Sequence, residues 1–131
     1  MLKLVKTSAL IVVASMAVAN TAQASIDTAL QNICTIVKTD DKSELRKKMK
    51  MVQTDFHMKL KDYYSGVTCD GNSLIRTAML SNAVETGTLL VKKMPKKDLT
   101  TPEQDGKTLQ AWASENGLEA SPIATVLSER I

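Results

Sequence analysis

Few side chains in this sequence have types and spacing that could do chemistry. Thioether and imidazole groups bind copper, and they gather at Met49, Met51, His57 and Met58. On a helix, residues two apart point to nearly opposite sides, so Met49 and Met51 would share a face only on a strand. Methionine is more commonly a core filler. We therefore expect no bound metal or cofactor, and a soft-metal (copper) or small-ligand binder is the alternative function.

Catalytic groups are sparse. His57 is the only histidine and lies among lysines, where a surface role is more common than that of a general base. No Gly-x-Ser-x-Gly, histidine-pair or phosphate-loop motif is present. Capping and turn roles explain the acids Asp40, Asp41 and Asp62. The sequence thus predicts no catalytic residue and no enzymatic activity, with a carboxylate-based hydrolase as the least favoured alternative.

Cys34 and Cys69 are the only cysteines, and we expect them to form a structural disulfide. They are too far apart for a Cys-x-x-Cys redox motif, and structural zinc needs four ligands. Closing such a loop restricts the unfolded chain by about 4 kcal/mol.

The first residues have the three parts of a secretory signal peptide. Lys3 and Lys6 are followed by an apolar run from Ala9 to Ala19 and by Ala22-Gln23-Ala24. The run is shorter than the roughly 20 residues that span a bilayer. We expect cleavage between Ala24 and Ser25, and a periplasmic or secreted product without a transmembrane segment.

Hydrophobic periodicity predicts an all-α or nearly all-α fold of packed helix pairs. We expect a helix over Ile26–Lys38. A second helix should be capped by Asp41 and Glu44 and carry the apolar residues from Leu45 to Tyr63. After Val52 the apolar residues also alternate with polar ones, which is the pattern of a strand. Helices from Leu74 and up to Pro95 should flank a break near 81–83, before a polar linker over 92–106. Two short helices should follow, the first ended by Gly117 and the second opened by Ser121-Pro122. The expected divisions are a signal peptide (1–24), a disulfide-linked helical domain (25–97) and a helical hairpin (98–131).

The stretch Leu30 to Met94 resembles a family of small exported gammaproteobacterial proteins known only as an uncharacterised domain. Cys34 and the run CDGNSLIRTAM, headed by Cys69, carry the resemblance. It implies an exported protein of unknown role and assigns no catalytic residue. The run from Asp70 to Lys93 is also similar to one ankyrin helix pair, although Leu74 and Arg76 replace the usual proline and histidine.

The run from Leu109 to Arg130 has the spacing of a DNA-reading helix-turn-helix. DNA affinity depends on neutralising phosphates, yet residues 98–131 carry two basic and six acidic side chains. Export would also remove the protein from DNA. We therefore expect no nucleic-acid partner.

Basic residues concentrate elsewhere in the sequence. One cluster is Arg46, Lys47, Lys48 and Lys50, and a second surrounds Pro95 with Lys92, Lys93, Lys96 and Lys97. Such clusters are usually solvated faces, here with an acidic tail available to neutralise them. The functional interpretation is a surface for an anionic partner. We expect a non-catalytic interaction or accessory protein whose partner is an unknown protein or an anionic envelope component.

Overall fold

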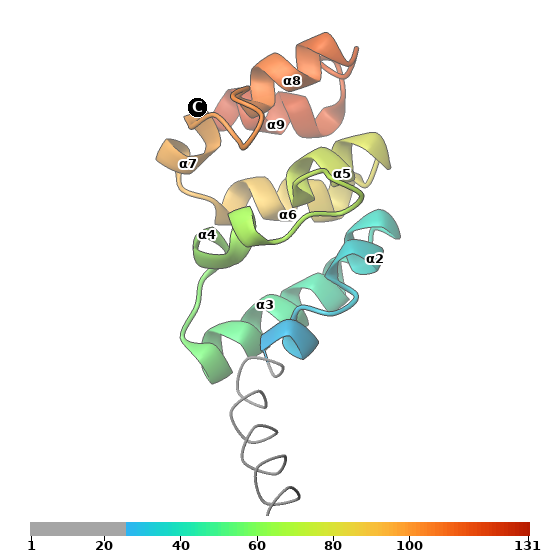
Figure 1. Cartoon of the computed structure of the whole chain (residues 1–131). Coiled ribbons are helices and arrows are strands. Elements are labelled where there is room, and N and C mark those ends of the chain that lie inside the picture. The colour runs from blue at the N-terminus through green and yellow to red at the C-terminus, as the bar shows by residue number, and fades with distance from the viewer. Residues whose placement is uncertain (1–25) are drawn as a thin grey trace, which may run out of the picture. The chain divides into compact units, whose positions relative to one another are not determined.

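Helices make up the regular secondary structure of residues 26–131, the range that the computed structural model describes, and no β-strand occurs in that range (Figure 1). The predicted all-α class is therefore confirmed there. The predicted signal peptide and its cleavage point after Ala24 lie outside the described residues. The described residues 26–31 belong to one compact unit, and Asn32–Ile131 form a second, separate one.

The second unit contains eight α-helices among its described residues, several of them a single turn or two. They are α2 (Ile33–Lys38), α3 (Lys42–Phe56), α4 (Leu60–Tyr63), α5 (Leu74–Leu80), α6 (Val84–Lys93), α7 (Lys96–Thr100), α8 (Leu109–Glu115) and α9 (Pro122–Arg130). A short 3-10 helix, Tyr64–Gly66, follows α4.

Within this unit, helix pairs are stacked in chain order. The pairs are α2–α3, α5–α6 and α8–α9; the first helix of each pair packs on the first helix of the next, and the second helices do the same (Figure 1). Their facing sides form the core, in which Val37, Leu45, Leu74, Leu90 and Leu127 are fully buried. The arrangement buries one continuous apolar layer that no single pair could bury alone.

The second and third pairs are built from matching local signals 35 residues apart. Gly71 and Gly106 both have positive φ, and Ser73 and Thr108 both cap the next helix by accepting a backbone N–H. The turns inside the three pairs each contain a left-handed residue, namely Asp40, Asn82 and Gly117. The predicted break near 81–83 and the predicted caps at Asp41, Gly117 and Ser121 are confirmed.

Two predicted long helices are interrupted. The helix expected over Ile26–Lys38 breaks at residues 30–32, because Asn32 adopts the left-handed conformation with φ 68°. The helix expected to run on to Tyr63 ends at Phe56, where His57 has φ 56°, and resumes at Leu60. Asparagine and histidine reach this conformation more easily than most residues. The strand interpretation after Val52 is wrong.

The expected polar linker over 92–106 contains a helix. Pro95 precedes α7, and Leu99 of α7 is buried, so this segment contributes to the core. The stretch with helix-turn-helix spacing is the third stacked pair, in which Ile123, Ala124 and Leu127 bury one face of α9 while α9 packs on α6. The predicted division between residues 97 and 98 stays a prediction.

Candidate functional site

A groove with positively charged walls lies where α3, the start of α4 and the end of α6 meet. We call it the basic groove. Its volume is about 470 Å³, and it is lined by Arg46, Met49, Lys50, Gln53, Lys59, Leu60 and Lys93. It joins part of the first predicted basic cluster to one residue of the second.

The fold explains how residues far apart in sequence reach one groove. Arg46, Met49, Lys50 and Gln53 follow the three- and four-residue spacing that places side chains on one face of α3. Because α3 packs on α6, that face lies beside Lys93 in the last turn of α6. The left-handed His57 ends α3 and lets the chain bring Lys59 and the buried Leu60 to the groove.

The four charged side chains that line the groove form no ion pair among the described residues. They are Arg46, Lys50, Lys59 and Lys93, and no carboxylate lines the groove with them. Of the other predicted cluster residues, Lys47 pairs with Glu44 at 3.5 Å, and Lys48 does not line the groove. The acidic C-terminal segment pairs with Arg76 and Lys107 instead.

A second concave region, of about 590 Å³, contains a polar cluster that sequence reasoning missed. The guanidinium of Arg76 in α5 is buried and donates two hydrogen bonds to Asp105, at 2.7 and 3.0 Å, and one to the carbonyl oxygen of Lys107. Its Nε lies 2.7 Å from Oε1 of Glu103, but the N–H is not directed at that oxygen, so this contact is an ion pair only. The guanidinium also lies 5.1 Å from the ring centroid of Trp112.

Tyr64 extends this polar cluster. Its hydroxyl oxygen lies 3.0 Å from Oγ of Ser73 and 2.8 Å from Oε2 of Glu103. Burial raises the pKa of Tyr64, and hydrogen bonds from Arg76 lower the pKa of Asp105 to about 2. These groups therefore stay neutral and ionised, respectively, at neutral pH. Each of these polar groups has a hydrogen-bond or ion-pair partner within the cluster. Together these contacts hold residues 103–107 against α5.

One sequence signal could have revealed the polar cluster. Arg76 is a charged residue between Ile75 and Thr77, all three of them buried on α5. A buried cation requires a partner of opposite charge. The sequence does not indicate which of its acids provides that partner.

The residues weighed as copper ligands in the alternative function do not all share one face. Met49 lines the basic groove, whereas Met51 is 39% exposed and lies two residues further along a continuous helix. His57 is exposed at the end of α3. Within residues 26–131, no group of three histidine, cysteine or carboxylate side chains could hold a metal ion.

The acids considered for catalysis have local structural partners. Asp40 accepts hydrogen bonds from the backbone and hydroxyl of Thr86, at 2.8 and 3.2 Å. Asp41 caps α3, and Asp62 accepts from the backbone N–H of Lys59 at the start of α4. Capping and turn roles therefore account for all three.

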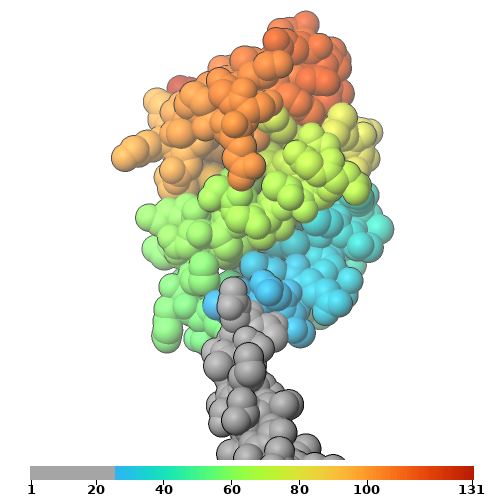
Figure 2. Space-filling view, in the orientation of Figure 1, coloured from blue at the N-terminus to red at the C-terminus, as the bar shows by residue number. Residues whose placement is uncertain are grey.

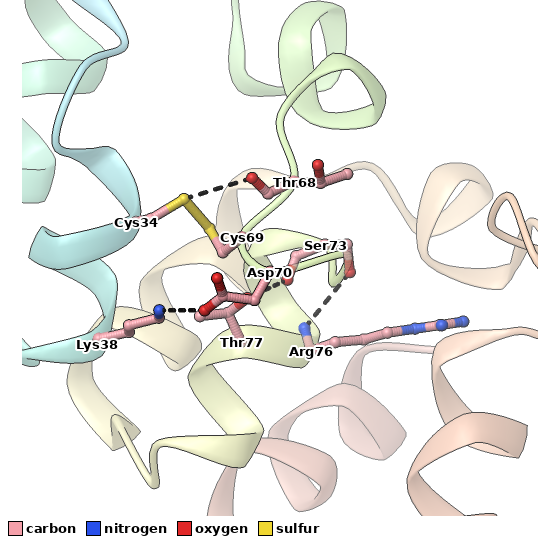
Figure 3. The surroundings of a disulfide bond; sticks show 8 residues. All are labelled: Cys34, Lys38, Thr68, Cys69, Asp70, Ser73, Arg76 and Thr77. Atoms are coloured by element: carbon pink, nitrogen blue, oxygen red, sulfur yellow. Dashed lines mark hydrogen bonds and ion pairs between the residues drawn. A yellow bond between two sulfur atoms is a disulfide. The ribbon is translucent and has the colours of Figure 1, made fainter.

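The predicted disulfide is present. Cys34 of α2 is bonded to Cys69 in the loop before α5, with 5.6 Å between their Cα atoms (Figure 3). Next to it, Lys38 pairs with Asp70 at 2.8 Å and lowers the pKa of that exposed carboxyl. The disulfide links the first stacked pair to the loop that precedes the second, as the Arg76 contacts link the second pair to the loop that precedes the third.

Comparison with known proteins places the sequence in one family. The family of proteins of unknown function DUF3718 matches residues 33–101, which is over half of the chain and includes Cys34, Cys69 and the whole basic groove. The chain belongs to this family. No curated protein and no solved structure matches it significantly. The DUF3718 match ends at residue 101, before Glu103, Asp105 and the third helix pair.

Proposed function

We propose that this DUF3718 protein is an exported, non-catalytic binding protein whose basic groove takes an anionic partner. One observation carries the proposal: the fold brings Lys93 next to Arg46, Lys50 and Lys59 without a carboxylate in the lining. Four like charges around one concavity repel one another and attract an anion.

Two further observations support the export and non-catalytic parts of the proposal. Disulfides persist in oxidising compartments, so the Cys34–Cys69 bond favours the periplasm that the predicted signal peptide also indicates. A general acid near neutral pH needs a raised carboxyl pKa, yet the pKa of Asp105 in the larger concavity is lowered to about 2. Figure 2 shows the described residues layered in chain order, from blue to red-orange, on the face in view.

The test compares two double variants that remove the same charge from different places. Lys50→Gln with Lys93→Gln changes the groove, whereas Lys96→Gln with Lys97→Gln removes two exposed lysines that do not line it. Titration calorimetry with inorganic polyphosphate measures the affinity of each. We expect the groove variant to bind about thirtyfold more weakly, and the control variant within about threefold of the wild type.

Equal losses of polyphosphate affinity in the two double variants would contradict specific binding at the basic groove. Trp112 provides a second readout, since it lies in the polar cluster and is the only tryptophan. Polyphosphate binding that changes Trp112 fluorescence and is insensitive to the groove variant would overturn the proposal and favour ligand binding at the polar cluster.

A further inference from the structure

The geometry points to a specific source of the anion: we propose that the basic groove and the exposed face of α3 dock on the surface of an anionic phospholipid bilayer. This inference rests on the proposed function, which requires only an anion. Three observations favour a bilayer over another anionic partner.

The first observation is charge along one exposed helix and its neighbourhood. From Lys42 to Lys61 the sequence carries seven basic and two acidic residues, and Arg46, Lys47 and Lys50 are exposed on α3. Helix α3 has 15 residues and therefore extends over about 22 Å, which is longer than a single small anion can contact. A lipid surface presents phosphates over the whole of that length. Each lysine or arginine near such a surface strengthens binding about fivefold.

The second observation is apolar surface among these charges. Only Met51 and Leu80 are large apolar side chains that are clearly exposed within residues 26–131. Met51 follows Lys47 by four residues, so it lies on the same exposed face of α3. Met49 and Leu60 add apolar atoms inside the groove. Cationic side chains interspersed with apolar ones suit the boundary between headgroups and acyl chains.

The third observation weighs against an acidic protein as the partner. Stable protein interfaces bury about 800 Å² on each side and depend on tyrosine, tryptophan and arginine anchors. Trp112, Tyr63 and Tyr64 are all buried in this chain. The face around the groove therefore has charge but no exposed tyrosine or tryptophan. Among the described residues, no helix is long and apolar enough to cross a membrane, so contact from α3 would be at the surface.

The test is sedimentation of the protein, as isolated after export, with lipid vesicles. We expect it to bind vesicles that contain phosphatidylglycerol, with a strength that rises with the anionic fraction and falls in high salt. Vesicles of phosphatidylcholine alone should bind much more weakly. Lys50→Gln with Lys93→Gln should weaken vesicle binding about twenty- to thirtyfold.

A single variant separates lipid from other anions. Met51→Ser should weaken vesicle binding about three- to fivefold and leave polyphosphate binding unchanged, because only a bilayer offers an apolar phase. Circular dichroism checks that the variant is folded.

Polyphosphate binding without vesicle binding would overturn this inference and leave the proposed function standing, with an acidic protein as the remaining partner. Failure to bind either probe would overturn both. Vesicle binding that is equal in the wild type and the groove variant would also overturn the inference.

Discussion

Arg76 lies in the middle of α5, and its guanidinium is enclosed by Glu103, Asp105 and Trp112. A buried cation is tolerated because charge-assisted hydrogen bonds replace the water that it loses. These contacts explain how a loop with little apolar surface is held against the helix stack. They also engage Glu103 and Asp105, two of the acids that line the larger concavity.

Replacing Arg76 should therefore destabilise the fold. We predict that Arg76→Met lowers the free energy of unfolding by about 3 kcal/mol, because Glu103, whose side chain is only 14% exposed, is left without its cation. Arg76→Lys should lower the free energy of unfolding by less, since the positive charge remains and only the bidentate hydrogen bonding to Asp105 is lost. Urea denaturation followed by circular dichroism measures both. A loss below about 1 kcal/mol for Arg76→Met would mean that the cluster is not structural.

The contribution of Asp105 should depend on pH. Hydrogen bonds from Arg76 lower its pKa from 3.8 to about 2 in the folded chain. The unfolded chain therefore binds the proton at higher pH, so the stabilisation is complete above the unfolded pKa and is lost as the pH falls towards 2. We predict that the urea midpoints of wild type and Asp105→Asn differ near pH 6 and converge as the pH approaches 2. A difference that is the same at every pH would contradict this assignment.

At the scale of elements, local signals predicted most helix starts and stops. Caps such as Asp41, Ser73 and Ser121 act within three residues and can be read directly from the sequence. The left-handed Asn32 and His57 could not be predicted, because neither residue type requires that conformation. The helix α7 has five residues, which is too few for a clear period.

The basic groove could be predicted only in part, because its residues are far apart along the chain. The basic cluster that contains Arg46 and Lys50 was visible in the sequence, as was Lys93 in the other cluster. Their meeting depends on the packing of α3 against α6, which no local pattern encodes. The pairing of Arg76 with Asp105 was missed for the same reason.

The close contact between α6 and α9 makes a prediction about a glycine. A Cβ at Gly87 would lie 2.7 Å from Cγ1 of Ile123 and would also crowd its Cδ1. Ile123 is buried and cannot move aside easily. We predict that Gly87→Ala destabilises the protein by about 1–2 kcal/mol despite the better helix propensity of alanine. Gly66→Ala is the control, since a Cβ there meets nothing within 4 Å. Thermal melts that rank the two variants in the opposite order would contradict the packing.

At the scale of the molecule, stacked pairs depend on their neighbours for stability. The Cys34–Cys69 bond ties the first pair to the second and closes a loop of 35 residues. We predict that replacing both cysteines with serine lowers the free energy of unfolding by about 4 kcal/mol. Guanidinium denaturation of the oxidised wild type and the double variant measures the loss. Equal midpoints would show that the stack does not need the link.

Charge is also divided along the molecule. The segment 25–97 has 13 basic and 8 acidic residues, whereas 98–131 has two and six. The acids that pair in the C-terminal segment do so with Arg76 and Lys107, which leaves the groove cations available. The whole chain can therefore carry a small net charge and still present a strongly basic site.

Amide chemical-shift mapping during a polyphosphate titration tests the basic groove most directly. The account predicts that the largest shifts occur at Arg46, Lys50, Lys59 and Lys93, and that they disappear in high salt. The largest shifts at Arg76, Trp112 and Glu103 instead, or equal shifts at every exposed lysine, would contradict it.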